Sequence, residues 1–430
     1  MKPEVVTLGL GYIGLPTSAL IASKSTSVLG VDIDQKVVDT VNGGKIHFVE
    51  PELDKVVSNV VAKGFLRAST TPVSADVYLI VVPTPFKENY QPDISFVESA
   101  TREILSLLKK GDLFIIESTS PIGTTEKMQD LIYEFRPDLR EELYIAYCPE
   151  RVLPGNIMFE LVNNDRVIGG VDKASTQKAI TFYSKYVKGK LHATNARTAE
   201  MCKLVENSSR DVQIAFANEL SLICEKADVN VWDLINLANK HPRVNILQPG
   251  CGVGGHCIAV DPYFIISHYP EQSKMIAKAR EINNYKSLWC VEKIKNERLQ
   301  FEKKNRRKPL IALMGLAFKP NIDDLRESPA KYIIQQLLNN SNDGNFLVVE
   351  PNIKWYNNHR LTDFEEACEN ADGVVIMTEW NEFRGISLSY LKSLMKRPVL
   401  LDTRNILDVK KLKKNNFLFD NVGHNLFNEN

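Results

Sequence analysis

The sequence predicts an α/β protein in which two doubly wound, mostly parallel sheets are joined by a central helical region with one long helix. Short apolar runs alternate with helix-like segments near both ends of the 430-residue chain, which is typical of parallel sheets covered by helices on both faces. Between them, residues 198–228 contain neither Gly nor Pro, and their apolar side chains recur at helical spacing. We therefore expect three domains, at 1–197, 198–301 and 302–430.

The individual elements follow from hydrophobic periodicity. Residues 4–8, a glycine turn, a helix at 15–24 and a strand at 27–33 form a βαβ opening. The remaining expected strands are 77–82, 113–116, 144–146, 310–314, 346–349, 374–377 and 399–401. The remaining expected helices are 231–240, 271–300, 329–339 and 363–371, and the charged segment 302–308 is predicted to be an exposed linker.

Composition excludes several functional classes. Lys plus Arg (53) equals Asp plus Glu (53), so no global basic field favours nucleic acid or an anionic membrane. No apolar stretch approaches the roughly 18 residues of a spanning helix, and the N-terminus does not resemble a secretory signal, so the cytoplasm is expected. The seven cysteines are scattered without a C-x-x-C pair, which predicts neither a disulfide framework nor a metal site.

The glycine turn after the first strand has the spacing G-x-G-x-x-G, at Gly9, Gly11 and Gly14. The first glycine permits the turn, the second allows the backbone to approach a pyrophosphate, and the third allows helix and strand to pack closely. Asp32 stands 18 residues beyond Gly14, at the end of the second strand, where a carboxylate accepts hydrogen bonds from a ribose 2′-hydroxyl. This context predicts a Rossmann-like domain that prefers NAD to NADP. The alternative is a structural turn with a solvated Asp32.

A second glycine-rich segment, residues 250–262, presents Cys257 with Asp261 four residues further on. A thiolate adds to an aldehyde to give a thiohemiacetal, and hydride loss then gives a thioester that water hydrolyses. We therefore predict that Cys257 is a nucleophile, although a buried structural thiol is the common alternative. Cys251 is expected to be such a structural thiol, and His256 a packing or hydrogen-bonding residue.

The long helix carries Lys203, Asn207 and Arg210 at i, i+4 and i+7, so two cations and an amide share one face. These groups suit an oxyanion or a phosphate, whereas the alternative is a solvated helix face.

Several ordered motifs carry a resemblance to the UDP-glucose and UDP-N-acetylmannosamine dehydrogenases. They are residues 9–14, 82–85, 117–125, the glycine loop that ends in Cys257, and residues 315–319 and 323–329. The resemblance covers essentially the whole chain. Within the family, residues 149–155 and 240–250 resemble the branch that acts on UDP-N-acetyl-D-mannosamine. Pro154 stands where the UDP-glucose enzymes usually carry a second Glu, and Cys251 departs from the proline expected in the loop.

The resemblance implies a UDP-sugar substrate, NAD as cofactor and a homodimer formed through the long helix. It implies that NAD is held by the glycine turn and by Tyr12, Ile13, Asp32, Thr84, Thr119 and Arg326. The implied substrate contacts are Arg151, Val152, Lys203, Asn207, Arg210, His241, Arg243, Gly254, Phe318, Lys319 and Arg404. Arginine and lysine suit a diphosphate because guanidinium binds it bidentately and ammonium supplies a compact charge.

The implied reaction oxidises the C6 alcohol of UDP-N-acetyl-D-mannosamine to a carboxylate with two NAD⁺. Lys203 is the expected base, directly or through a water held with Asp261, and Cys257 captures the aldehyde. Lys203 and Asn207 would stabilise the oxyanion, and Glu150 would orient the hydrolytic water. The full set of expected catalytic residues is Cys257, Lys203, Asn207, Asp261, Glu150 and Thr119.

Three alternatives remain open from the sequence. UDP-glucose or UDP-N-acetylglucosamine as substrate changes only the sugar. A single-step 3-hydroxyacid dehydrogenase of the 6-phosphogluconate type shares the fold and a catalytic Lys, but needs neither Cys257 nor a second nucleotide-binding domain. A non-enzymatic dinucleotide-sensing module explains the glycine turn and leaves the Cys257 loop without a purpose.

Overall fold

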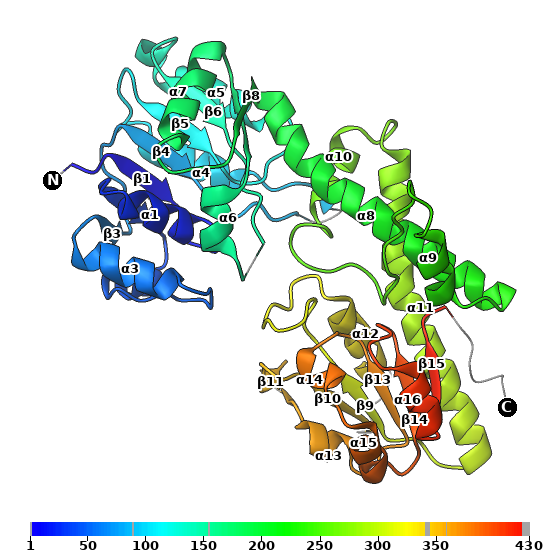
Figure 1. The fold of residues 1–430 in the computed structure, drawn as a ribbon. Helices are drawn as coiled ribbons and strands as arrows, with labels where there is room; N and C mark the ends of the chain where they lie inside the picture. Colours follow the sequence, from blue (N-terminus) through cyan, green and yellow to red (C-terminus); the bar gives the residue numbers. More distant parts are fainter. Residues whose placement is uncertain (1, 88–89, 154, 340–344, 358, 424–430) are drawn as a thin grey trace. The chain divides into compact units, whose positions relative to one another are not determined.

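The structure is a computed structural model that describes residues 2–87, 90–153, 155–339, 345–357 and 359–423. Pro154, one of the residues that carried the sugar prediction, lies outside the described residues. The chain divides into two compact units, Met1–Glu206 with Tyr263–His268, and Asn207–Pro262 with Tyr269–Asn430. Each unit contains one large sheet covered by helices, and the long helix α8 (Ala196–Ala227) begins in the first unit and ends in the second (Figure 1). The predicted fold class is confirmed, whereas the predicted domain boundaries at 198 and 302 stay predictions.

The sheet of the first unit has the strand order β3-β2-β1-β4-β5-β6-β7-β8. Its strands are β1 (Val5–Leu8), β2 (Val28–Val31), β3 (Leu66–Ser69), β4 (Val77–Ile80), β5 (Leu113–Ile116), β6 (Tyr144–Tyr147), β7 (Arg166–Gly170) and β8 (Leu191–Asn195). Its helices are α1 (Gly14–Ser23), α2 (Gln35–Asn42), α3 (Leu53–Ala62), α4 (Ser95–Ile104), α5 (Thr124–Phe135), α6 (Ile157–Asn163) and α7 (Lys173–Tyr183). Pairing is parallel except between β6 and β7, where it is antiparallel.

Alternation along the strands builds two cores, one on each face of this sheet. Val5 and Leu79 pack with α1, α2, α3, α6 and α7, whereas their neighbours Val6 and Tyr78 pack with α4 and α5. Because successive strand residues point to opposite faces, runs such as Leu113–Ile116 must be apolar throughout. The strand predictions succeeded here for that reason.

The sheet of the second unit has the order β10-β9-β13-β14-β15, and all its pairs are parallel. Its strands are β9 (Ile311–Met314), β10 (Phe346–Val349), β13 (Gly373–Ile376), β14 (Val399–Asp402) and β15 (Leu418–Asn421), with a separate hairpin of β11 (Trp355–Tyr356) and β12 (His359–Arg360). Helices α11 (Lys274–Asn305) and α12 (Pro329–Leu338) cover one face. The other face is covered by α13 (Phe364–Cys368), α14 (Asn381–Arg384), α15 (Leu388–Leu394) and α16 (Val409–Lys414).

The helices between the sheets correct one prediction. The expected helix at 198–228 is observed as α8, and the expected helix at 231–240 as α9 (Val231–Ala238). The segment 302–308 was predicted to be a linker, but α11 continues to Asn305 and ends where Arg306 adopts φ 55°. The prediction was wrong because Glu, Lys and Gln are strong helix formers, so a charged segment can extend a helix. The short helix α10 (Asp261–His268) was not predicted.

Candidate active site

The glycine turn of the first unit leaves space at one position only. A Cβ on Gly9, which has φ +96°, would lie 2.5 Å from the carbonyl oxygen of Val81, and a Cβ on Gly14 would lie 1.9 Å from the carbonyl oxygen of Gly9. A Cβ on Gly11 would meet nothing within 4 Å. Gly9 and Gly14 are therefore required by the packing of strand and helix, and Gly11 faces open space at the start of α1. This is the division of roles that a pyrophosphate cradle needs.

Asp32 lies directly after β2 and closes this cradle. Its Oδ2 accepts a hydrogen bond from the backbone N–H of Leu10 at 2.9 Å, and its Oδ1 accepts one from Asp34 at 3.0 Å. Asp32 is half-buried, and its oxygens keep lone pairs for a ribose hydroxyl. Nearby in the turn, Tyr12 is 38% exposed and its ring centroid lies 4.4 Å from that of Phe48. Ile13 is half-buried beside it.

Thr84 and Thr119 follow β4 and β5, which are neighbours in the sheet, so both lie at its carboxyl edge. The Ser118 hydroxyl joins the two loops by donating to the carbonyl oxygen of Val82 at 2.7 Å. The buried carboxylate of Glu200, near the start of α8, accepts from the N–H groups of Gly123 at 2.6 Å and Thr125 at 2.8 Å. It thereby caps α5 and fixes the first turns of α8, which carry Lys203, against the loop of Thr119.

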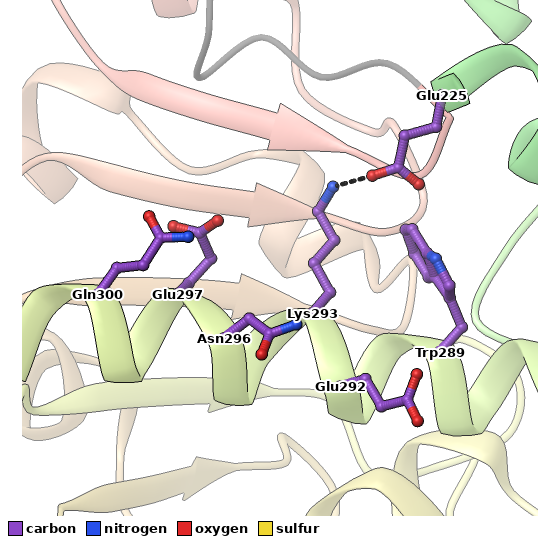
Figure 2. Close-up of a pocket in the computed structure, with 7 residues that line it drawn as sticks. All are labelled: Glu225, Trp289, Glu292, Lys293, Asn296, Glu297 and Gln300. Carbon is purple, nitrogen blue, oxygen red and sulfur yellow. Dashed lines mark hydrogen bonds and ion pairs between the residues drawn. The ribbon is translucent and has the colours of Figure 1, made fainter. Parts of the chain in front are cut away.

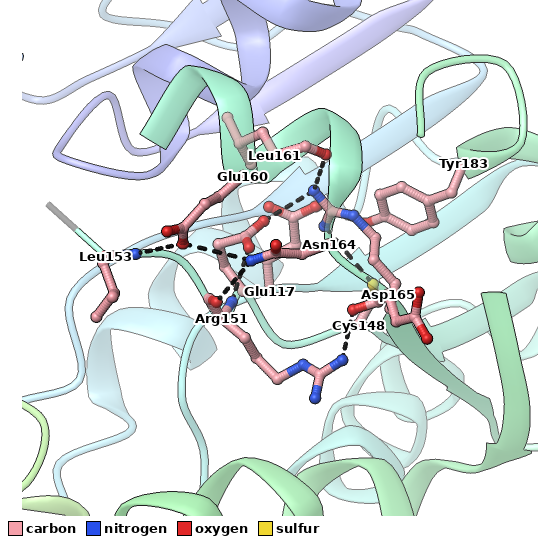
Figure 3. A network of polar contacts seen from close by, with 11 residues as sticks. Glu117, Cys148, Arg151, Leu153, Glu160, Leu161, Asn164, Asp165 and Tyr183 are labelled. Atoms are coloured by element: carbon pink, nitrogen blue, oxygen red, sulfur yellow. Dashed lines mark hydrogen bonds and ion pairs between the residues drawn. The ribbon is translucent and has the colours of Figure 1, made fainter. Parts of the chain in front are cut away.

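A buried polar network of the first unit contains Glu150 and Arg166. Figure 3 shows this network and labels Glu117, Arg151 and Tyr183 in it. The guanidinium of Arg166, on β7, lies 2.9 Å from Glu150 Oε2, and the backbone N–H of Arg151 donates to Glu150 Oε1 at 2.7 Å. Tyr183 donates its hydroxyl to Glu117 at 2.5 Å, and the centre of the Arg166 guanidinium lies 5.0 Å from the centroid of the Tyr183 ring. Glu150 is thus held in one orientation by a buried cation.

Burial of this network raises the pKa of two of its groups. Burial raises the pKa of Glu117 to about 7, although the charge of Arg166 opposes that rise. Burial also raises the pKa of the Cys148 thiol to about 12, so this thiol stays protonated. Glu117 therefore holds a proton up to near neutral pH, which leaves the cation of Arg166 to Glu150.

The predicted substrate contacts of the first unit are partly engaged within it. Arg151 Nη1 lies 2.6 Å from Glu206 Oε1 on α8, and its Nη2 donates to the carbonyl oxygen of Asp165. Val152 is half-buried and packs against the core. The Arg151 guanidinium is therefore paired with a carboxylate within the first unit, and its role in substrate binding stays a prediction.

The loop of Cys257 lies in the second unit and ends at the start of α10. The carbonyl oxygen of Cys257 accepts from the N–H groups of Val260 at 3.1 Å and Asp261 at 2.8 Å, and the side chain of Cys257 is half-buried. Asn207 donates its amide to Asp261 Oδ2 at 2.5 Å, and Asp261 is 3% exposed. Asn207 and Asp261, each predicted separately to be catalytic, are therefore brought together. Lys203 lies one turn earlier on α8 and is half-buried.

Two predicted substrate residues, Phe318 and Arg404, meet this loop from within the same unit, as does the predicted NAD contact Arg326. A Cβ on Gly254 would lie 2.7 Å from the Phe318 side chain, and the N–H of Gly255 donates to the carbonyl oxygen of Arg326 at 3.0 Å. A Cβ on Gly250 would lie 2.3 Å from Arg404 Nη1. The glycines are thus explained by the close packing of Phe318 and Arg404 against the loop.

Other predicted side chains of the second unit are exposed or pair with a close neighbour in the sequence. His241 and Arg243 are exposed in the loop after α9, where the Arg243 N–H donates to His241 Nδ1 at 3.3 Å. Arg210 and Lys319 are also exposed. The guanidinium of Arg326 pairs with Asp324 at 2.6 Å.

Cys251 is 4% exposed and its thiol donates to the carbonyl oxygen of Met377 at 3.6 Å, so it is a core residue. All seven cysteines are present as thiols. In the part of the chain that the structure describes, no group of three His, Cys, Asp or Glu side chains is arranged to hold a metal ion. Within the same limits, no helix combines the length and apolar character needed to span a bilayer.

A separate polar cavity of about 240 Å³ lies along α11 (Figure 2). It is lined by Glu225, Trp289, Glu292, Lys293, Asn296, Glu297 and Gln300. Lys293 lies 2.8 Å from Glu225 and 2.6 Å from Asp420. None of its lining residues was predicted to take part in catalysis or binding.

Sequence reasoning missed several residues that support the site. Glu350 follows β10 as Asp32 follows β2, and its carboxylate accepts the N–H groups of Leu316 and, at 3.0 Å, Ala317 in the second unit's own glycine turn. That parallel was visible in the sequence, because Gly315 follows β9 as Gly9 follows β1. Arg166 carried no such signal, because no sequence pattern links it to its partner Glu150, which lies 16 positions earlier.

Comparison with known proteins agrees with this architecture. Residues 3–187, 197–285 and 312–409 match, in order, the NAD binding domain, the central domain and the UDP binding domain of the UDP-glucose/GDP-mannose dehydrogenase family. The UDP-N-acetyl-D-mannosamine dehydrogenase of Escherichia coli strain K12 is 53% identical over 399 residues, 89% of this chain and 95% of that protein. An NDP-N-acetyl-D-galactosaminuronic acid dehydrogenase of Ralstonia nicotianae is 49% identical over 420 residues, 95% of this chain and 97% of that protein.

Among solved structures, the UDP-D-ManNAc dehydrogenase from Pyrococcus horikoshii matches with a TM-score of 0.89 and 39% identity, covering 97% of this chain and 99% of that one. The similarity extends over both units and over the helices between the sheets. The resemblance found in the sequence motifs and the expectation of an NAD-dependent enzyme are therefore confirmed. This chain belongs to the UDP-glucose/GDP-mannose dehydrogenase family.

Proposed function

We propose that this NAD-dependent dehydrogenase oxidises UDP-N-acetyl-D-mannosamine to UDP-N-acetyl-D-mannosaminuronate, with Cys257 as covalent nucleophile. The observation that carries the proposal is the 53% sequence identity to a UDP-N-acetyl-D-mannosamine dehydrogenase, which is covered over 95% of that relative's length. The glycine loop supports it, because it delivers a half-buried thiol next to the ordered pair Asn207 and Asp261.

The residues of the first unit fit NAD. The open space at Gly11, the start of α1 and the carboxylate of Asp32 suit a pyrophosphate and an adjoining ribose. The other proposed contacts are the predicted residues Tyr12, Ile13, Thr84, Thr119 and Arg326. When bound, NAD⁺ supplies the hydride acceptor for both oxidations.

In the first oxidation, Lys203 removes the C6 hydroxyl proton, directly or through a water held with Asp261, as the C6 hydride departs. The product is an aldehyde. The Cys257 thiolate then adds to its carbonyl carbon, and the new alkoxide takes a proton to give a thiohemiacetal. Asn207 and Lys203 stabilise the negative oxygen during this step.

In the second oxidation the thiohemiacetal loses a second hydride and its hydroxyl proton, which leaves a thioester on Cys257. Water attacks the thioester carbon, the C–S bond breaks, and the carboxylate and the thiol are released. Glu150, held by Arg166, is proposed to orient this water. One sugar nucleotide, two NAD⁺ and one water thus give one uronate, two NADH and protons.

The choice of sugar is tested by turnover. The Ralstonia relative, at 49% identity, makes an N-acetyl-D-galactosaminuronic acid dehydrogenase the second candidate, and both candidates share an acetamido group. UDP-N-acetylmannosamine, UDP-N-acetylgalactosamine, UDP-N-acetylglucosamine and UDP-glucose should be compared by kcat/KM under one set of conditions. The first should give the highest value, and a higher value with any other donor would overturn the assignment.

We further propose a homodimer formed along α8. Phe216 and Ile223 are 51% and 56% exposed on this helix, and Leu237 on α9 is 69% exposed, so a partner chain along α8 would bury apolar surface. Light scattering should give twice the 48.6 kDa chain mass, and Phe216→Glu should lower it. A monomer at micromolar concentration would contradict this. The cytoplasm is the proposed compartment, since seven thiols suit a reducing environment.

A further inference from the structure

A buried polar seam joins α8 and α11 within the second unit. Asp211 and Asn218 on α8 are fully buried, and Arg280, Asn283 and Ser287 on α11 are 4%, 1% and 7% exposed. Buried polar groups at a helix interface are costly unless every partner is in place. Their contacts lead from an ion pair to the loop of Cys257.

The hydrogen bonds of this seam have a fixed direction. Arg280 Nη1 lies 2.7 Å from Asp211 Oδ1, so Asp211 is an acceptor, and Asn283 must donate to it through Nδ2 at 2.8 Å. The Oδ1 of Asn283 then accepts from Asn218 Nδ2 at 2.9 Å. This leaves Asn218 Oδ1 facing the N–H of Gly250, from which it accepts at 2.9 Å. The charge of Asp211 therefore determines which end of the Asn218 amide meets the loop.

Ser287 holds the next part of the loop from α11. Its hydroxyl donates to the carbonyl oxygen of Cys251 at 2.8 Å. Gly252 has φ +135°, and a Cβ there would lie 2.4 Å from Ser287 Oγ, so only glycine lets the backbone come this close. The loop is therefore fixed at Gly250, Cys251 and Gly252, five to seven residues before Cys257.

We infer that Asn218 and Ser287 are positioning residues for Cys257, which act by clamping the start of the glycine loop onto the seam between α8 and α11. Four glycines at 250, 252, 254 and 255 give the loop little stiffness of its own. Its far part is held by the bond from Gly255 to the Arg326 carbonyl, so the start of the loop must be anchored separately. A thiol that must meet an aldehyde in one geometry needs such anchoring.

The inference rests on the proposed function for its catalytic readout, and Asn218→Ala tests it. Ser221→Ala is the matched control, because Ser221 is fully buried on the same helix. Its hydroxyl accepts from Lys286 at 2.7 Å and donates to the Asn218 carbonyl oxygen at 2.6 Å, so its hydrogen bonds go to the two helices and not to the glycine loop. Asn218→Ala should lower kcat for the uronate by about 10- to 100-fold with little change in the UDP-sugar KM. Ser221→Ala should keep kcat near the normal value, even where the melting temperatures of the two variants fall by the same amount.

Hydrogen exchange without any sugar provides a readout independent of the substrate. In Asn218→Ala the amide of Gly255 should exchange faster, although Asn218 does not touch it, because the loop is released at its start. Ser221→Ala should leave that amide unchanged. Failure of the normal enzyme to turn over UDP-N-acetylmannosamine would overturn the proposed function, and the exchange result would still decide the clamp. Normal exchange at Gly255, or a kcat loss equal in both variants, would overturn the positioning role.

Discussion

Glu117→Gln tests the buried proton of the first unit. The pKa of Glu117 is raised from an ordinary 4.5 to about 7 in the native protein. Between these two pH values the Glu117 carboxyl is therefore protonated in the folded protein and ionised in the unfolded chain. The contribution of protonated Glu117 to the free energy of unfolding is therefore fully present below about pH 4.5 and is lost as the pH rises through about 7. At about 1.4 kcal/mol per pH unit, the free energy of unfolding should fall by about 3 kcal/mol. Glutamine stays neutral and shows no such fall.

The assay is the melting temperature of the normal protein minus that of the variant, from pH 5 to pH 8. Between pH 5 and pH 8 this difference should fall by roughly 5–10 °C, because the normal protein loses stability and the variant does not. A loss of about 1 kcal/mol lowers the melting temperature of a domain of this size by roughly 2–4 °C. Glu134→Gln, which changes an exposed carboxylate on α5, is the control and should give a flat difference. A flat difference for Glu117→Gln as well would refute the buried proton.

Three further substitutions test the binding sites. Gly11→Ala should keep the melting temperature but raise the KM for NAD, because its Cβ meets only the open space proposed for the pyrophosphate. Gly14→Ala should lower the melting temperature, because its Cβ would lie 1.9 Å from the Gly9 carbonyl oxygen. An equal fall in melting temperature for both variants would contradict the open space at Gly11. Asp32→Ala should narrow the preference for NAD over NADP, and equal turnover with NADP in the normal protein would disprove the role of Asp32. Arg243→Ala should raise the UDP-sugar KM more than the NAD KM, and an unchanged sugar KM would make Arg243 a solvated surface residue.

Much of the fold could be predicted because its signals are local. The strand at 113–116 is apolar at every position, and α8 repeats its apolar side chains every three or four residues, so each pattern specifies one element. Strand β8 was missed because its residues are mostly exposed or half-buried and carry no apolar run. The end of α11 was misplaced because charge does not distinguish a linker from a solvated helix.

The candidate site divides in the same way. The glycine turn, Asp32 and the loop of Cys257 are contiguous motifs, so the sequence alone indicated them. Arg166 and Asn218 act through partners that only folding brings near. The antiparallel pairing of β7 with β6 brings Arg166 to Glu150, and the packing of the glycine loop against α8 brings Gly250 to Asn218. Periodicity along one sequence does not encode such pairs. The roles assigned to Lys203, Glu150 and Thr119 remain predictions.

The central claim is a four-electron oxidation through Cys257, and NADH stoichiometry tests it most directly. Limiting UDP-N-acetyl-D-mannosamine with excess NAD⁺ should yield two NADH per sugar and no free aldehyde with the normal enzyme. Cys257→Ser should slow the second oxidation and hydrolysis far more than the first oxidation, because a hydroxyl is a poorer nucleophile than a thiolate and its ester a poorer acyl donor than a thioester. Mass spectrometry should then find a covalent adduct at position 257, or a trapping reagent should find released aldehyde. Two NADH per sugar at a near-normal rate from Cys257→Ser would contradict the covalent mechanism.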